Sequence, residues 1–307
     1  MRKISEEELK NILEDHKVWL LSAKKDGKRA DLSKTNLLNI DLQNLNLSGA
    51  NLRHADLVGS NLSHANLSEA DLTKANLLGD SNLTDANLYN ATLYNANLSK
   101  ANLTSAYLVD ANLSKADLSE ANLTKAHLGY ANLVRANLCK ANLSSANLSN
   151  TNLAEADLRG ANLSDANLTC AYLAQAGLYK VNLTDANLYN ATLYNANLSK
   201  ANLSSADLSN TNLAEADLSE ANLTDANLRY TKLCNTKLPK RIIQIGPIGS
   251  RKNYTIINID DDIIHCGCWK GNTEEFKNRI NETYPDDGEY RTQYLGLIKL
   301  IESLKAK

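Results

Sequence analysis

The 307-residue sequence predicts an all-β solenoid, a stack of short coils, over residues 30–240. A leucine returns every fifth residue in this range, in ten copies over residues 30–79 and in 32 more over residues 81–240. Five residues are not a whole number of α-helical turns, and leucines five apart would alternate between the two faces of a strand. The chain also has one phenylalanine and one methionine, which would make a poor globular core.

Each five-residue unit has a simple plan. Alanine usually stands two residues before the leucine, and asparagine or aspartate stands one before it. The period makes sense if each unit forms one side of a coil, with leucine pointing to a common axis and alanine leaving room for it. Asp80 is one extra residue between the two blocks, and we expect it to form a small bulge at a corner.

The pattern resembles the pentapeptide-repeat family, whose consensus is A(D/N)LXX. Residues 121–125 (ANLTK) and 216–220 (ADLSE) match this consensus in full, and the resemblance covers about two thirds of the chain. It implies a right-handed quadrilateral β-helix with four units in each coil.

Two internal duplications agree with a coil of 20 residues. Residues 82–103 recur unchanged at 182–203, an offset of 100. Residues 141–158 recur at 201–218 with one substitution, an offset of 60. Both offsets are multiples of 20, so copying preserved the side of the coil on which each residue lies.

Residues 1–29 are expected to form an N-terminal capping helix. Ser5 and Glu8 have the spacing of a capping box at the start of a helix over residues 5–23. An open end of a β-helix exposes unpaired backbone groups, and this helix would cover that end, with Trp19 as a contact. We interpret His16 as a packing or capping residue and not as a ligand.

Residues 241–307 are expected to form a small α+β module with the order ββαα. The sequence predicts a turn at 246–249 and strands at 254–257 and 263–269. A first helix follows the capping pair Asn272 and Glu275, and a second carries an apolar stripe that could pair with itself. The module resembles segments found after pentapeptide repeats, or alone, in bacterial proteins.

Charge and composition exclude several functional classes. The net charge of −2 divides into +2 for residues 1–29, −4 for 30–240 and zero for 241–307, so no block is basic enough to predict direct nucleic-acid binding. No signal sequence or membrane-spanning segment is predicted. Five irregularly spaced cysteines suit a reducing compartment, and we expect a cytoplasmic bacterial protein.

The sequence predicts no catalytic, cofactor-binding or metal site. Cys139, Cys170 and Cys234 fall on different sides of a four-sided coil. In the C-terminal module, Cys266 and Cys268 would share one face of a strand while His265 points away. Zinc usually takes four ligands, and this cluster has only three candidate residues. An enzyme with metal or redox chemistry in this module is therefore the third hypothesis. The repeated asparagines are expected to bond to turn backbone.

Outward tyrosines are the candidate partner-binding residues: Tyr89 and Tyr94, and their duplicates Tyr189 and Tyr194. Tyrosine supplies apolar area with a polar tip, which suits binding. The same side chains could instead lie over neighbouring coils and shield the backbone.

Two functions are compatible with this sequence. We expect a non-enzymatic rigid scaffold or protein-interaction module, monomeric or homodimeric, whose partner is another protein. The alternative is a DNA-mimicking topoisomerase (gyrase)-binding protein of the quinolone-resistance type. A DNA mimic should display continuous acidic rows, but one side mixes Lys125 with Asp165 and another mixes Lys100 with Glu120, which disfavours it.

Overall fold

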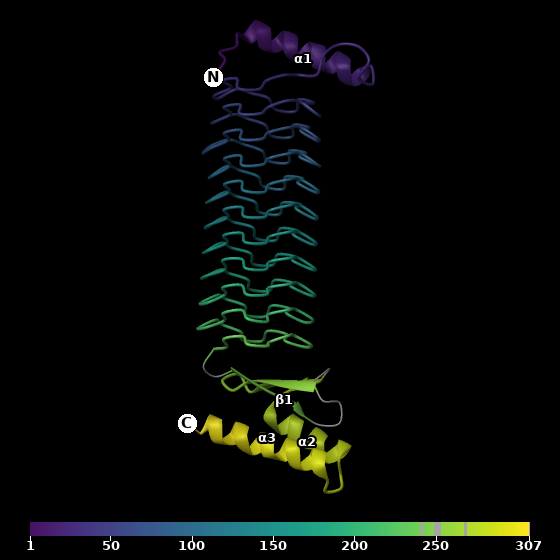
Figure 1. The fold of residues 1–307 in the computed structure, drawn as a ribbon, viewed down its shortest axis with the longest axis vertical. Coiled ribbons are helices and arrows are strands. Elements are labelled where there is room, and N and C mark those ends of the chain that lie inside the picture. The colour runs from purple at the N-terminus through teal and green to yellow at the C-terminus, as the bar shows by residue number, and fades with distance from the viewer. Residues whose placement is uncertain (240–241, 249–252, 267–268, 307) are drawn as a thin grey trace.

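The computed structural model describes residues 1–239, 242–248, 253–266 and 269–306. Figure 1 shows a straight column of stacked coils with helix α1 (Glu6–Leu21) across one end and a small module of strands and helices at the other. The described part therefore contains a helix, a column of coils and a module of strands and helices, in that order along the chain.

The coils contain four units each. Parallel bridges join the second residue of each unit to the residue 20 positions further on, as from Asp31 to Asn51 and onward to Asp71. The Leu32 N–H donates to the Asn51 carbonyl at 2.8 Å, and the Asn51 N–H donates to the Ala30 carbonyl at 2.9 Å. The repeated leucines are almost completely buried, which confirms that they share one central core.

Each unit ends in a tight turn that forms a corner. The leucine carbonyl accepts a hydrogen bond from the alanine N–H three residues on, as between Leu47 and Ala50 at 2.9 Å. The fifth residue of the unit has positive φ, for example +53° at Lys34, which costs a non-glycine residue about 1 kcal/mol. The Lys34 N–H donates to the Arg53 carbonyl of the next coil at 2.8 Å, and this bond helps to offset the cost.

The asparagine or aspartate of each unit stabilises the same turn. Oδ1 of Asp31 accepts a hydrogen bond from the Ser33 N–H at 3.1 Å, and the contact recurs from coil to coil. These side chains mimic a backbone turn. The predicted role of the repeated asparagines is confirmed.

The extra residue Asp80 lies at a corner, as predicted. Gly79 has a φ of +79°, and the chain bends at residues 79–80 in place of the usual turn. The bridge spacing changes to 21 there, from Asn61 to Asn82, and returns to 20 afterwards. Ser81 is buried and its hydroxyl donates to the Leu57 carbonyl at 2.9 Å, so the core continues past the insertion.

Helix α1 covers the first coil. The Ala30 N–H donates to Nδ1 of the buried His16 at 3.1 Å, and the His16 ring stacks on Trp19 with centroids 5.4 Å apart. Burial lowers the pKa of His16, with a smaller effect from Arg29. His16 is thus the capping residue that we predicted. Only half of the expected capping box forms, because the Ser5 hydroxyl accepts from the Glu8 N–H while the Glu8 carboxylate pairs with Arg2.

The C-terminal module contains two more strands than expected. Its antiparallel sheet has the order β1 (Ile242–Ile248), β2 (Asn253–Asn258), β3 (Ile263–Cys266) and β4 (Trp269–Gly271). Strand β1 occupies most of the segment predicted as a turn at 246–249, of which residue 249 lies outside the described residues. The single strand predicted over 263–269 is instead divided between β3 and β4.

The two sides of this sheet have different partners. Ile256 packs with the solenoid core, whereas Ile257 and Ile264 pack with helices α2 (Thr273–Thr283) and α3 (Glu289–Lys305). The predicted capping box of Asn272 and Glu275 is present at α2. The apolar stripe of α3 is buried inside the module, so it is not the self-pairing surface that we considered.

Candidate interaction surface

The register assigns every outward side chain to a face or a corner. The second residue of each unit lies at the middle of a face, and the fourth and fifth residues form the next corner. We call one of these sides, with its two bordering corners, the tyrosine face. Its middle column consists of Asp31, Asn51, Asp71, Thr92, Asn112, Asn132, Asn152, Tyr172, Thr192, Asn212 and Lys232.

The four candidate tyrosines border this one face. Tyr89 and Tyr94 occupy the corners on either side of Thr92, and Tyr189 and Tyr194 repeat the arrangement five coils further along. At about 4.8 Å for each coil, the two pairs are roughly 24 Å apart. The structure therefore brings each pair to one level of the face and separates the two levels.

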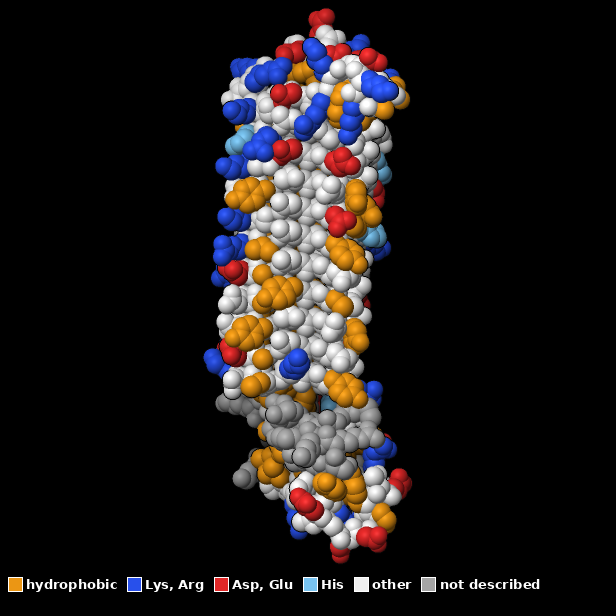
Figure 2. Space-filling view, turned by 45° about the vertical axis from the view of Figure 1, so that its right-hand side comes forward, with side chains coloured by type: hydrophobic (Ala, Val, Ile, Leu, Met, Phe, Trp, Pro, Cys, Tyr) orange, Lys and Arg blue, Asp and Glu red, His pale blue; other side chains and the backbone are white. Residues whose placement is uncertain are grey.

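Other exposed tyrosines belong to the same face. Tyr130 and Tyr230 lie on the corner that carries Tyr89, and Tyr172 lies in the middle column. Tyr94 is half-buried, so the face holds six of the seven exposed tyrosines of the solenoid. The seventh, Tyr107, lies on the adjacent side, and its ring centroid is 6.3 Å from that of Tyr89. Figure 2 shows such a surface, with hydrophobic side chains along both edges of a mostly uncharged band.

The corner that holds Tyr94 and Tyr194 also carries charge. Lys115 Nζ lies 5.6 Å from the centre of the Tyr94 ring and 3.3 Å from its hydroxyl. Tyr194, in contrast, donates a hydrogen bond from its hydroxyl to the Glu215 carboxylate at 2.7 Å, and this hydrogen bond raises the pKa of Tyr194. The two duplicated tyrosines therefore meet a cation in one case and an anion in the other.

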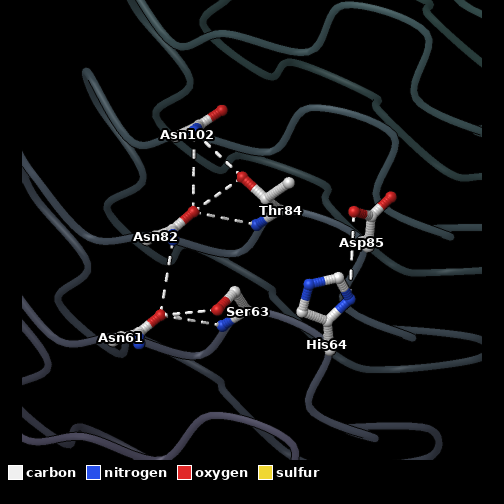
Figure 3. Close-up of polar contacts among 7 residues, drawn as sticks. All are labelled: Asn61, Ser63, His64, Asn82, Thr84, Asp85 and Asn102. Atoms are coloured by element: carbon white, nitrogen blue, oxygen red, sulfur yellow. Dashed lines mark hydrogen bonds and ion pairs between the residues drawn. The ribbon is translucent and has the colours of Figure 1, made fainter.

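The opposite side of the column carries a network of side-chain hydrogen bonds that links successive coils. Asn102 Nδ2 donates to Oγ1 of Thr84 at 2.9 Å, and that hydroxyl donates to Oδ1 of Asn82 at 2.7 Å (Figure 3). Asn82 in turn donates to Asn61, at 3.3 Å, and His64 lies 3.8 Å from Asp85 at the neighbouring corner. We call this side the asparagine face.

The histidine and cysteine residues considered for metal or redox chemistry do not form one cluster in the described part of the chain. His265 is buried against the last coil, and burial, with Lys270 and Arg229 nearby, lowers its pKa to about 4. Cys266 faces the module's helical core and accepts a hydrogen bond from Thr255 at 3.3 Å, and Cys268 lies outside the described residues. Cys139, Cys170 and Cys234 are free thiols on three different corners.

Two kinds of feature are absent from the described residues. No group of three or more histidine, cysteine, aspartate or glutamate side chains there is arranged to hold a metal ion. In the same part of the chain, no helix has the length and apolar character needed to cross a membrane.

These features define a four-sided β-solenoid with one tyrosine-lined face. The family model for pentapeptide repeats matches eight copies, over residues 28–63, 46–79, 81–119, 116–153, 146–185, 166–204 and 201–238. The chain belongs to the pentapeptide-repeat family, and its solenoid is the right-handed quadrilateral β-helix that the resemblance implied.

Three solved structures illustrate the similarity. HetL, a pentapeptide repeat protein involved in heterocyst differentiation regulation in the cyanobacterium Nostoc, is 39% identical, with a TM-score of 0.65 over 69% of this chain and 94% of HetL. QnrB1, a plasmid-mediated fluoroquinolone resistance protein, is 20% identical, with a TM-score of 0.28 over 67% of this chain and 90% of its own.

The third structure is Rfr23, from the cyanobacterium Cyanothece. It is 34% identical over 36% of this chain and 63% of its own, with a TM-score of 0.17. No curated protein matches the chain.

Proposed function

We propose that this protein is a non-enzymatic, rigid scaffold that binds another protein through the tyrosine face. The observation that carries the proposal is the gathering of six exposed tyrosines on one side of the column. Tyrosine is enriched at protein interfaces because its ring offers a large apolar area and its hydroxyl forms hydrogen bonds.

The rigid backbone favours such binding. Hydrogen bonds join every coil to the next, so little backbone order has to be gained when a partner docks. The similarity to HetL, a protein involved in regulation, supports a regulatory binding role. Free cysteines support a cytoplasmic location, and the near-neutral charge supports a protein partner over a nucleic acid.

A DNA mimic finds no support on this surface. The corner beside Tyr94 places Arg135 next to Glu155, with nitrogen to oxygen distances of 2.8 and 3.1 Å, whereas a mimic needs continuous acidic rows. We expect no effect on gyrase supercoiling at micromolar protein, with or without a fluoroquinolone.

Affinity capture from a host lysate tests the proposed function. The variant carries Tyr89→Ser, Tyr94→Ser, Tyr189→Ser and Tyr194→Ser, and the matched control carries Tyr179→Ser, at a corner outside the tyrosine face. We expect the wild type and the control to retain the same protein and the fourfold variant to lose it. Equal retention by all three would contradict a role for this face.

A further inference from the structure

We propose that a second copy of this chain docks on the tyrosine face, with the two columns antiparallel. The two-fold axis would lie in the interface, perpendicular to the columns, midway between the levels of Asn132 and Asn152. This inference rests on the proposed function, because it uses the same face and names one protein that fits it.

The regular stacking makes such a contact continuous. Rotation about this axis turns one column end over end and keeps each corner on its own side. Both columns have the same coil spacing, so coils that meet at one level also meet at the levels above and below. The Asp80 insertion lies on a corner outside the tyrosine face and leaves the spacing regular on either side of it.

The duplication makes the face self-complementary in its tyrosines. Segment 82–103 of one copy would meet segment 182–203 of the other, and the two segments are identical. Tyr94 then lies opposite Tyr194 of the partner subunit, and Tyr89 lies opposite Tyr189 of the partner subunit. A two-fold interface uses the same patch on both subunits, as this arrangement requires.

The charges on the Tyr94 corner are complementary under the same rotation. Toward the N-terminal end the corner carries the basic residues Lys34, Arg53, Lys74, Lys115 and Arg135, and toward the C-terminal end it carries the acidic residues Glu155 and Glu215. Arg135 would therefore meet Glu155 of the partner subunit, and Lys74 would meet Glu215 of the partner subunit. Complementary charges of this kind fix register and exclude other arrangements.

The rest of the face adds one like-charge approach, because Arg53 would meet the level of Lys232 of the partner subunit. Arg53 is paired with Asp71 of its own chain at 3.0 Å, which reduces the repulsion. Lys115 would meet the level of Tyr172 of the partner subunit and Gln175 of the partner subunit. Asp71 would meet Asn212 of the partner subunit. On the opposite corner, Asp110 would meet the level of Cys170. Burial of the α3 stripe removes the other surface considered for self-association.

Sedimentation of the full chain tests this dimer first. We expect a wild-type dimer at micromolar concentration, and at least about tenfold weaker dimerisation in both Arg135→Glu and Glu155→Arg, because each places two like-charge contacts across the interface. The control Lys125→Glu, on a corner outside this face, should leave dimerisation unchanged. A wild-type chain that stays monomeric at 100-fold higher concentration would overturn the proposal.

Mixing the two charge variants is the decisive step. Both variants also lose the intrachain pair of Arg135 and Glu155, and mixing cannot restore that pair. One variant has glutamate at both positions 135 and 155, and the other has arginine at both. These two chains attract each other only if the two positions meet across an intermolecular interface. Native mass spectrometry should show the heterodimer in the mixture. A mixture that contains only monomers would refute the antiparallel arrangement.

The two proposals fail separately. If the chain does not self-associate but still captures a protein from the lysate through these tyrosines, the dimer is refuted and the binding function stands. If the chain self-associates but captures no other protein through these tyrosines, the face serves only for contact between copies of this chain.

Discussion

Asn182 Nδ2 donates a hydrogen bond to Oδ1 of Asn162, 2.8 Å away in the preceding coil. The contact is one step of a ladder along the asparagine face, in which the donor always belongs to the later coil. Asn162 donates to Asn142 at 3.2 Å in the same direction. The series ends where Asn61 donates to Asp41, whose carboxylate only accepts.

The direction of the ladder gives a prediction for Asn162→Asp. The carboxylate can still accept from the Ser164 N–H and from Asn182, but it cannot donate to Asn142. We expect a loss of about 1 kcal/mol in the free energy of unfolding, measured by chemical denaturation. Asn112→Asp is the control, because Asn112 accepts from Ser114 in its own turn. An equal loss in both variants would show that the ladder adds nothing.

Deletion of Asp80 should be tolerated. Gly79 is already the fifth residue of its unit and has a φ of +79°, close to the +68° of Gly59 in a regular corner. Without Asp80, Gly79 would be followed directly by Ser81, which occupies the alanine position of the next unit. We expect an unchanged or higher thermal midpoint by circular dichroism. A protein that unfolds at a much lower temperature would show that the bulge is needed.

The central leucines should dominate stability. Leu143 is fully buried in the solenoid core, and Leu143→Ala should cost about 2–5 kcal/mol in the free energy of unfolding, since a cavity remains. Leu38 lies at a corner and is 43% exposed, so Leu38→Ala should change that free energy by about 0.5 kcal/mol or less. Chemical denaturation of both variants measures the difference, and equal losses would contradict the inward position of the repeated leucine.

Acid should weaken the described C-terminal module through His265. Its folded pKa is about 4 and its ordinary value is 6.5, so the unfolded chain binds more protons between these values. Stability therefore falls as pH drops from about 6.5 to 4, by on the order of 3 kcal/mol. Denaturation at several pH values, followed by tryptophan fluorescence, measures this slope. His265→Gln should flatten it, and an unchanged slope in that variant would assign the effect to other groups.

The repeat made most of the solenoid predictable. The spacing of the leucines required inward aliphatic side chains, and the duplications agreed with the four-unit coil that the bridges confirm. The C-terminal sheet was harder to predict. Gly246 and Pro247 are typical of a turn, yet they lie in β1, beside an irregularity of register between Ile245 and Ile248.

The candidate surface was predictable only in part. The duplication pointed to Tyr89 and Tyr94 from the sequence. That these two flank a single face depends on which positions of a unit lie in mid-face and which at a corner, and leucine spacing does not reveal this. The pairing of His16 with the Ala30 backbone is likewise a tertiary contact without a sequence signal.

Hydroxyl-radical labelling of the protein in a host lysate tests the central claim most directly. The unbound reference is the purified protein at nanomolar concentration, and each tyrosine is quantified by mass spectrometry. If the tyrosine face is the binding surface, Tyr89, Tyr94, Tyr189 and Tyr194 will be protected in the lysate while Tyr179 is labelled equally in both samples. Equal labelling of all five tyrosines in the two samples would contradict the account.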